Sequence, residues 1–326
     1  MDPARERRRP ARYLLVDGGR TACRAAVFEG EKQVASASTP GLPYRRDGSL
    51  DPILAALGEA IGAVRARTVG TRHGRFDTVV LGLASIDTPE LAALINAHVR
   101  SLVEASGVLV TVDVVTNYVG AVGMRPGTVV AAGTGVIALA VAEAGSFARA
   151  DGWGYILGDD GSGYDIGRQG LAAALRTIDG RGNFDALREK AERRFGPLEE
   201  VSRRVYEATN PVGLVAGFAP DVAAAAREGD PAAGQIWTAA ASEIARTTIA
   251  ATSRVFRRGA SVRVSWTGGL FAEEELLLAP FRERVAGEWP SAELCSPRAG
   301  PIAGALALAR TGPSPLFEPL VSRFDS

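Results

Sequence analysis

Carboxylates and glycines are concentrated in one stretch of the chain, residues 151–170, whose sequence is DGWGYILGDDGSGYDIGRQG. Glycines at this density let the backbone turn close to a ligand. Asp159 and Asp160 stand where the loop gives way to the pattern of a helix, so their carboxylates are expected beside backbone N–H groups. A polyhydroxylated ligand needs such a mixture of hydrogen-bond donors and acceptors. A long turn that leads into a capped helix has the same pattern, so this stretch by itself leaves the two interpretations open.

A turn with the chemistry to bind phosphate lies near the start of the chain, in the sequence Asp17-Gly18-Gly19-Arg20-Thr21. Apolar runs precede and follow it, which predicts a β-hairpin. Gly18 and Gly19 allow backbone N–H groups to approach a phosphate, and Thr21 adds a hydroxyl. The carboxylate of Asp17 can hold Mg²⁺ through water. Asp-Gly-Gly also occurs in ordinary turns, and this is not the GxxxxGK sequence of a Walker A loop.

Strands alternate with amphipathic helices after this hairpin. We expect helices at residues 51–67 and 88–103 and strands at residues 76–83 and 108–115. This alternation predicts a mainly parallel sheet covered by helices. Ligands gather at the carboxyl ends of the strands of such a sheet, which is where Ser85, Asp87 and Asn117 fall.

The same pattern starts again in the second half of the chain. From Thr128, the sequence VVAAGTGVIALAVA repeats the arrangement of strand, glycine-containing turn and strand, and a mainly helical region follows at residues 171–257. A further strand ends in Thr267-Gly268-Gly269-Leu270 and is expected to lead directly into a helix. A Gly-Gly turn there lets a flat ring lie against the backbone, although a purely structural turn would look the same. The chain is therefore predicted to contain two related halves.

Composition restricts the kinds of partner. The 326 residues include 37 basic and 37 acidic side chains, so no overall charge attracts nucleic acid or an anionic membrane, and a small-molecule partner is favoured. Cys23 and Cys295 are far apart, which argues against a disulfide framework, a zinc site or an iron–sulfur cluster and indicates the reducing cytoplasm. Residues 1–11 are arginine-rich without the apolar segment of a signal peptide, and we expect a disordered tail.

The motifs, taken in order, resemble those of the N-acetylglucosamine kinase and BadF/BadG/BcrA/BcrD-type ATPase family. They are DGGRT, GLASID, VVTN with AAGTG, GWGYILGDDGSGYDIG and TGGL, and the resemblance runs from about Tyr13 to Arg310. It implies a two-domain, actin-like α/β fold in which a ribonuclease H-like motif is duplicated and the ligand cleft lies between the domains. It places one domain at residues 12–122 with 301–320 and the other, with a helical insertion, at residues 123–300. It also implies a homodimer.

The resemblance assigns roles to several groups of residues. The ATP phosphates and Mg²⁺ would face Asp17, Gly18, Gly19 and Thr21 on one side and Gly133, Thr134 and Gly135 on the other. The adenosine would lie by Gly268 and Gly269. The sugar hydroxyls would be held by Asp159, Asp160, Asn117 and the backbone near Gly135, and catalysis would involve Asp159 and the residue at the position of the family's catalytic aspartate.

One departure from the family pattern concerns that catalytic aspartate. It is expected after the strand at VVTN, and alignment on Ala121 puts Asn117 in its place. A shift of one residue would put Tyr118 there, and neither residue is a carboxylate. An asparagine amide can orient a hydroxyl but cannot accept its proton at neutral pH. Losing a general base typically costs about 10²- to 10⁴-fold in rate. Asp165 is then either a replacement base or a solvated helix carboxylate.

Three functions follow from these observations. The first is an ATP-dependent kinase acting on the 6-hydroxyl of N-acetylglucosamine, glucosamine or a related amino sugar. The second is a catalytically impaired homologue that binds nucleotide or sugar as a sensor or partner protein. The third, the activator of an acyl-CoA dehydratase, needs paired cysteines for an iron–sulfur cluster, and the cysteine spacing disfavours it.

Overall fold

The computed structural model describes residues 9–44, 48–68, 74–86 and 88–325. The chain forms two compact units, one made of Met1–Met124 with Ala299–Ser326 and the other of Arg125–Arg298. Unit 1 is therefore discontinuous, because the chain leaves it for unit 2 and returns for its last segment. Most of the predicted tail, residues 1–8, lies outside the described residues, whereas the carbonyl of Ala11 accepts a hydrogen bond from the N–H of Gly30, 2.7 Å long.

Unit 1 is built on a six-stranded sheet in the order β11-β5-β4-β1-β2-β3. Its strands are β1 (Arg12–Gly18), β2 (Ala22–Glu29), β3 (Lys32–Pro40), β4 (Phe76–Leu83), β5 (Ala105–Val112) and β11 (Val321–Asp325). Strands β1 to β3 form an antiparallel meander, whereas β1, β4 and β5 are parallel. The last strand, β11, pairs antiparallel with β5 at the edge.

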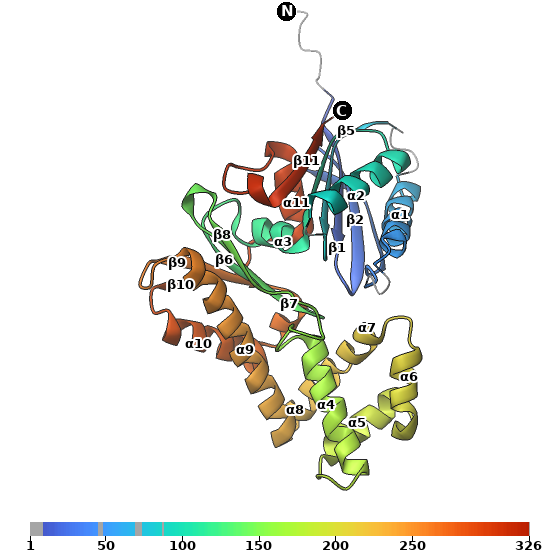
Figure 1. Cartoon of the computed structure of the whole chain (residues 1–326), viewed down its shortest axis with the longest axis vertical. Coiled ribbons are helices and arrows are strands. Elements are labelled where there is room, and N and C mark those ends of the chain that lie inside the picture. The colour runs from blue at the N-terminus through green and yellow to red at the C-terminus, as the bar shows by residue number, and fades with distance from the viewer. Residues whose placement is uncertain (1–8, 45–47, 69–73, 87, 326) are drawn as a thin grey trace, which may run out of the picture. The chain divides into compact units, whose positions relative to one another are not determined.

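Helices cover both faces of this sheet (Figure 1). They are α1 (Asp51–Ala66), α2 (Pro89–Leu102), α3 (Asp113–Val122) and α11 (Pro301–Thr311). Alternate strand residues face the two layers: Val79 and Leu81 join the core formed with α1 and α2, while α3 and α11 pack together on the other face. The alternation follows from the two-residue repeat of a strand, and burial of both faces explains the valine-rich strands.

Unit 2 repeats this plan with a five-stranded sheet in the order β10-β9-β6-β7-β8. Its strands are β6 (Gly127–Ala132), β7 (Val136–Val141), β8 (Phe147–Asp151), β9 (Val262–Thr267) and β10 (Ala292–Leu294). Strands β6 to β8 are an antiparallel meander, and β6, β9 and β10 are parallel. Each sheet thus places its own first five strands in the order fifth, fourth, first, second, third. The predicted duplication of a ribonuclease H-like motif is confirmed.

The helical region predicted between the β8 and β9 strands is present in unit 2. Its helices are α4 (Gly163–Ile178), α5 (Asp185–Phe195), α6 (Val201–Glu207), α7 (Pro211–Ala216), α8 (Ala219–Arg227) and α9 (Pro231–Val255). The 25-residue helix α9 begins with Asp230, whose side chain accepts a hydrogen bond from the N–H of Ala233, and with Pro231 in its first turn. Both residues suit a helix start, and α9 then packs along β6, β7 and β8.

Two sequence-based predictions of elements are wrong. The strand predicted at residues 108–115 ends at Val112, and Asp113 begins α3. The β-branched valines at 114 and 115 favour a strand locally, but burial of their side chains in the helix layer overrides that preference. The helix predicted directly after Thr267-Gly268-Gly269-Leu270 is preceded by a 3₁₀ turn, η3 (Gly269–Ala272), and a π-helical turn, η4 (Glu274–Leu278), before α10 (Ala279–Glu288) begins.

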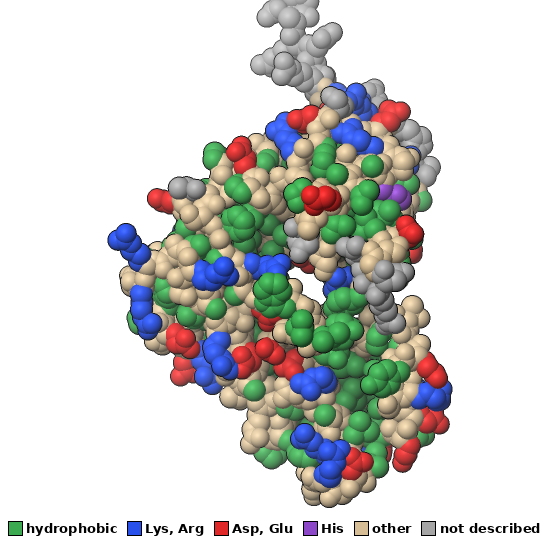
Figure 2. All heavy atoms as spheres, viewed as in Figure 1, with side chains coloured by type: hydrophobic (Ala, Val, Ile, Leu, Met, Phe, Trp, Pro, Cys, Tyr) green, Lys and Arg blue, Asp and Glu red, His purple; other side chains and the backbone are tan. Residues whose placement is uncertain are grey.

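Charged side chains are mixed over the visible surface. On the face shown in Figure 2, basic and acidic side chains alternate without forming one large field of a single sign. This distribution agrees with the equal numbers of acidic and basic residues. Among the helices of the described residues, none is both long and apolar enough to cross a bilayer.

Candidate active site

The parallel strands of unit 1 bring polar residues to one edge of the sheet. Gly18 lies opposite Leu83, and Leu83 lies opposite Val112, so β1, β4 and β5 end side by side. Asp17 is the last residue but one of β1, Ser85 follows β4, and Asp113 follows β5. Asp87, which the sequence also placed at this edge, lies outside the described residues.

The predicted phosphate turn is tightly packed, and a side chain in place of Gly18 would clash with its neighbours. A Cβ atom at Gly18 would lie 2.6 Å from a side-chain carbon of Leu83 and 2.8 Å from one of Leu42. Gly19 donates to the carbonyl of Ala22 at 3.1 Å and accepts from the N–H of Leu42 at 2.9 Å. Thr21 is exposed beside this turn. The turn is therefore fixed by backbone hydrogen bonds and leaves its outer surface open to a ligand.

Asp17 carries a buried charge at this turn. The residue is only 4% exposed, and its Oδ2 accepts a hydrogen bond from Nη1 of Arg24 at 3.2 Å. Burial raises the pKa of Asp17, and the positive charge of Arg24 opposes that rise. A buried carboxylate beside a single cation is a suitable group to face a further cation.

Asp113 is a carboxylate at this strand edge that the sequence-based predictions did not single out. It is the first residue of α3, directly after β5, and is partly exposed at the strand edge. Burial of its carboxyl within surrounding protein, followed by the negative charge of Asp17, raises the pKa of Asp113 to about 6, while the charge of Arg20 acts in the opposite direction. The rule that polar residues at the carboxyl ends of parallel strands form sites could have found it, because a single aspartate follows the apolar run VLVTV.

Asn117 lies one helical turn beyond the strand end. Its Nδ2 donates to the backbone carbonyl of Asp113 at 2.9 Å, within α3. The prediction that Asn117 directly follows the strand is wrong, since four residues of helix separate it from Val112. The residue that directly follows the strand is Asp113, which carries a carboxylate.

Arg20 connects the phosphate turn to two other loops of unit 1. Its Nη1 donates to the carbonyl of Pro43 at 2.6 Å, its guanidinium carbon lies 4.0 Å from the ring centre of Tyr44, and its Nη2 donates to the hydroxyl of Ser85. Ser85 has a φ of 60°, a left-handed conformation that non-glycine residues rarely adopt. Such strain is typical of residues held in place at functional sites.

In unit 2, the glycine-rich turn after β6 is joined to Asp159. The N–H of Val136 donates to Oδ1 of Asp159 at 2.9 Å, and Asp159 is only 5% exposed. A Cβ atom at Gly135 would lie 2.8 Å from both carboxylate oxygens. The N–H of Asp159 in turn donates to Oδ1 of Asp151 at 2.9 Å, and both aspartates have left-handed φ values near 60°. This carboxylate is therefore held in one place by the turn that faces it.

Helix α4 is fixed to the same turn. The N–H groups of Gly163 and Tyr164 donate to the carbonyls of Gly133 and Thr134, at 2.8 and 3.3 Å. The Ser162 hydroxyl caps the helix by accepting from the N–H of Asp165 at 3.2 Å. The long stretch singled out from the sequence thus contains both a capped helix and a structured loop.

The second Gly-Gly turn of unit 2 reaches the same place. Gly268 has a φ of 104°, and a Cβ atom there would lie 2.1 Å from the carbonyl oxygen of Ala132. Ala132 is the last residue of β6, directly before Gly133. Gly269 is exposed beside it. Three motifs far apart in the sequence therefore meet at the carboxyl end of β6.

The remaining acidic residues of this loop differ in their surroundings. Asp160 is exposed. The carboxylate of Asp165 accepts from the N–H of Gly161 at 3.1 Å and from the side chains of Arg168 and Gln169, both at 2.9 Å, so it is held within the loop and the first turn of α4. Trp153 is 68% exposed, with the guanidinium carbon of Arg149 lying 4.6 Å from its ring centre.

No preformed metal cage exists among the described residues, in that no three His, Cys, Asp or Glu side chains gather as metal ligands. Two carboxylates at the strand edge of unit 1, Asp17 and Asp113, interact electrostatically instead. Mg²⁺ is commonly bound by one or two carboxylates together with substrate phosphates and water. The residues present therefore fit a magnesium ion that arrives with a nucleotide.

Known proteins share both the sequence and the fold of this chain. It is 28% identical over 241 residues to the N-acetylmuramic acid/N-acetylglucosamine kinase of Clostridium acetobutylicum, a match covering 72% of this chain and 77% of that protein. It is 25% identical over 310 residues to the N-acetyl-D-glucosamine kinase of Dictyostelium discoideum, covering 91% and 97% of the two chains.

A crystal structure from Chromobacterium violaceum, assigned as an N-acetylglucosamine kinase, superimposes on this chain with a TM-score of 0.71 at 26% identity, covering 92% of this chain and 99% of that one. The two sheets and the helices around them are thus those of an actin-like sugar-kinase fold. The sequence profile of the BadF/BadG/BcrA/BcrD ATPases matches residues 16–309, nearly the whole chain. The protein belongs to the BadF/BadG/BcrA/BcrD ATPase family.

Proposed function

We propose that the protein is an ATP-dependent kinase that transfers a phosphoryl group to the 6-hydroxyl of N-acetylglucosamine or a related amino sugar. The observation that carries this proposal is Asp113, a carboxylate with a raised pKa at the same strand edge as the phosphate turn of Asp17. The names of the relatives, which are kinases of N-acetylglucosamine and N-acetylmuramic acid, support the substrate class.

Asp113 is suited to act as the general base. A carboxylate with a pKa of about 6 is mostly ionised at neutral pH, yet it is more basic than an ordinary aspartate. It would accept the proton of the attacking sugar hydroxyl as the phosphoryl group is transferred. Asn117, whose side chain is bonded to the backbone of Asp113, would help to fix the first turn of α3.

The phosphate turn would position the nucleotide. Backbone N–H groups around Gly18 and Gly19 and the hydroxyl of Thr21 can donate to phosphate oxygens. Asp17 would hold Mg²⁺ through water, and the ion, when bound, would neutralise charge on the phosphates. Phosphoryl transfer depends mainly on positioning and charge stabilisation, so the rigidity of this turn is relevant to the rate.

Unit 2 would supply contacts to both ligands. Asp159 has one carboxylate oxygen bonded to Val136 and, through its other lone pairs, could accept hydrogen bonds from sugar hydroxyls, with exposed Asp160 next to it. Gly133, Thr134 and Gly135 would lie near phosphate, and Gly268 and Gly269 would let the adenosine approach the backbone. We extend the proposal to a homodimer in the cytoplasm, on the strength of the resemblance.

The catalytically impaired alternative has lost its main support. It depended on the absence of a carboxylate after the third parallel strand of unit 1, and Asp113 occupies that place. The phosphate turn and the two glycine turns of unit 2 are well ordered by hydrogen bonds and close packing. We therefore favour an active kinase.

The test is ADP release from Mg-ATP with a panel of sugars that includes N-acetylglucosamine, glucosamine, N-acetylmuramic acid and glucose. We expect turnover that depends on an amino sugar and a fall in kcat of about 10²- to 10⁴-fold in Asp113→Asn. Asn117→Ala removes a polar side chain from the same helix without removing the base, and it should lower kcat less than Asp113→Asn does. Undiminished turnover in Asp113→Asn, or no sugar-dependent turnover in the native protein, would contradict the proposal.

A further inference from the structure

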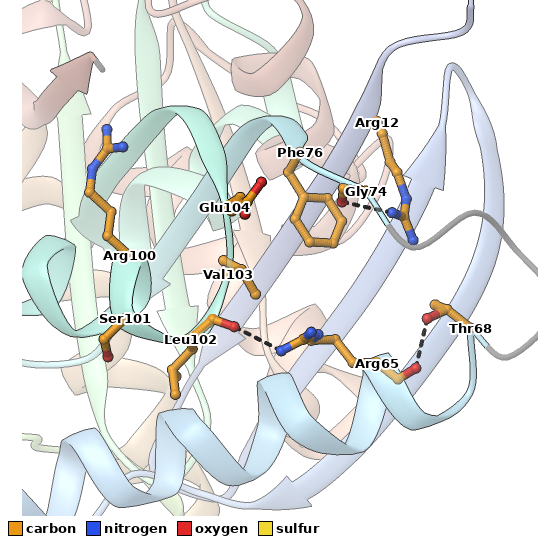
Figure 3. A pocket seen from close by; sticks show the side chains of 10 residues that line it. All are labelled: Arg12, Arg65, Thr68, Gly74, Phe76, Arg100, Ser101, Leu102, Val103 and Glu104. Carbon is orange, nitrogen blue, oxygen red and sulfur yellow. Dashed lines mark hydrogen bonds between the residues drawn. The ribbon is translucent and has the colours of Figure 1, made fainter.

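A second pocket lies within unit 1, at the edge of the sheet opposite the candidate active site. Its volume is about 420 Å³, and it is bounded by the amino ends of β1 and β4 and by the carboxyl ends of α1 and α2 (Figure 3). The residues that matter for its chemistry are Arg12, Arg65, Phe76, Val103 and Glu104. Its volume is within the range of small-molecule sites in proteins.

Arg12 is a buried cation in the wall of this pocket. It is only 4% exposed, and its guanidinium carbon lies 4.8 Å from the ring centre of Phe76. Nη1 donates to the carbonyl of Gly74 at 3.0 Å, but buried Nε has no hydrogen-bond partner in the described part of the chain. Leaving a buried donor without an acceptor is costly, and for a charged group especially so. The Nε–H of this guanidinium is therefore a buried donor that the described part of the chain leaves unsatisfied.

Other cations reinforce the positive charge around Arg12. Burial lowers the pKa of Arg12 most, and the charges of Arg9 and Arg65 lower it further, against the opposing charge of Glu29. Arg65 comes from α1 and donates from Nη1 to the carbonyl of Leu102 at 2.7 Å. Within the residues that the structure describes, neither Arg12 nor Arg65 forms an ion pair with a carboxylate. The cluster thus has charge left over for an anion.

Three neighbouring features affect the charge around this pocket. Arg100 has its guanidinium group committed to Asn96 and to the carbonyls of Ala105 and Phe324, and Figure 3 shows it pointing away from Arg12. The carboxyl ends of α1 and α2 contribute negative partial charge, which the bond from Arg65 to Leu102 offsets. Exposed Glu104 adds an acceptor at the rim.

We propose that this pocket binds a small, hydroxyl-bearing phosphate monoester. The side of a guanidinium formed by Nε and Nη2 matches two phosphate oxygens, and Arg65 would add a second cation. Phe76 and Val103 offer an apolar wall for the body of the ligand, and Glu104 can accept hydrogen bonds from its hydroxyls. This site is separate from the proposed kinase chemistry, which lies at the carboxyl ends of the same strands.

The experiment is calorimetric titration of the full chain at low salt with glycerol 3-phosphate, inorganic phosphate and glycerol. We expect saturable binding of the ester, weaker binding of inorganic phosphate and none of glycerol. Arg65→Gln should weaken binding of the ester by about tenfold or more, which corresponds to one lost charge-assisted hydrogen bond. Glu104→Gln should strengthen binding of inorganic phosphate several-fold, since it removes a negative charge from the rim.

The matched control is Arg67→Gln, because Arg67 follows the same helix and is exposed but donates to the carbonyl of Ser36 instead of lining the pocket. Asp17→Asn is a second control, which shows whether the ester binds at the phosphate turn of the proposed kinase site instead of in this pocket. Both variants should bind the ester with the affinity of the native chain. Arg12→Lys keeps the positive charge but loses the paired Nε and Nη2 donors of the guanidinium, so it should bind the ester more weakly. Equal affinities in Arg65→Gln and Arg67→Gln, a loss of binding in Asp17→Asn, or equal binding of ester and inorganic phosphate would overturn the proposal.

Discussion

At the scale of single residues, Asp113 has two opposed properties. Its surroundings and the charge of Asp17 disfavour the ionised carboxylate, yet a base must be ionised to accept a proton. We expect kcat/KM to fall as the pH is lowered through about 6, where this carboxyl becomes protonated. A pH–rate profile of ADP release measures it, and a profile that stays flat down to pH values near that of an ordinary aspartate, about 4, would contradict this assignment.

The same raised pKa predicts an effect on stability. The carboxyl of Asp113 is protonated more easily in the folded chain than in the unfolded one. The free energy of unfolding of the protein therefore falls as the pH rises from about 4 to about 6, where this carboxyl becomes charged in the folded chain. Asp113→Asn removes that charge. The variant should therefore melt at a higher temperature than the native protein above pH 6 and at nearly the same temperature near pH 4, as thermal unfolding would measure. A variant that is less stable at neutral pH would show that the charged form is favoured.

At the scale of elements, the glycine turn after β6 depends on the space around Asp159. Gly135→Ala would place a methyl group 2.8 Å from both carboxylate oxygens and displace the bond to the N–H of Val136. We expect a loss of about 1–3 kcal/mol in the free energy of unfolding and a larger loss of sugar-dependent turnover. Gly133→Ala is the control in the same turn, because a Cβ atom at Gly133 would meet nothing within 4 Å. Denaturant titration of both variants distinguishes crowding from a general intolerance of alanine.

Packing of α3 against α11 also depends on a glycine. A Cβ atom at Gly304 would lie 2.0 Å from the carbonyl oxygen of Thr116, whereas one at Gly300 would meet nothing within 4 Å. Gly304→Ala should therefore shift α11 and lower the melting temperature by several degrees, and Gly300→Ala should leave it nearly unchanged. Equal melting temperatures for the two variants would mean that the helices separate at little cost.

The elements of this fold could be predicted better than the site. Apolar runs predicted the first two strands of each meander and the parallel strands β4, β5 and β9, since burial of both sheet faces imposes valine-rich runs. The end of β5 could not be predicted from the sequence. Valine favours a strand, and valines stand on both sides of Asp113, in β5 before it and in α3 after it. An error of three residues at that end moved the position predicted for the catalytic base from an aspartate, which we now propose for that role, to an asparagine.

Contacts between segments that are distant in the chain could not be predicted from the sequence either. Gly268 was predicted to serve a ligand, but its approach to Ala132 is a packing contact that depends on β9 lying beside β6. The partners of Asp165, and the pairing of Asp159 with the N–H of Val136, depend equally on the arrangement of loop and turn. Motif order indicated the family, whereas the hydrogen-bond partners of the motif residues are seen only in the folded chain.

At the scale of the whole molecule, the two units differ in how much of the chain each requires. Unit 2 is one continuous segment, Arg125–Arg298, with its own core. Unit 1 needs the last segment, since Phe317 packs on Tyr118 with ring centres 5.3 Å apart and β11 pairs with β5. We expect residues 125–298 expressed alone to unfold cooperatively and residues 9–124 alone to lack a cooperative transition, as circular dichroism would measure. A cooperative transition in the shorter fragment would show that the last segment is dispensable.

This discontinuity has a consequence for synthesis on the ribosome. Strand β1, which carries Asp17, and helix α3, which begins with Asp113, are translated before unit 2, whereas α11 and β11, which complete unit 1, are translated after it. Domains generally fold as units, so unit 2 can fold before residues 299–326 are available to complete unit 1. A chaperone that shields the apolar face of α3 during that interval would act on the nascent chain of the first unit, and pauses in translation between residues 298 and 321 would lengthen its exposure.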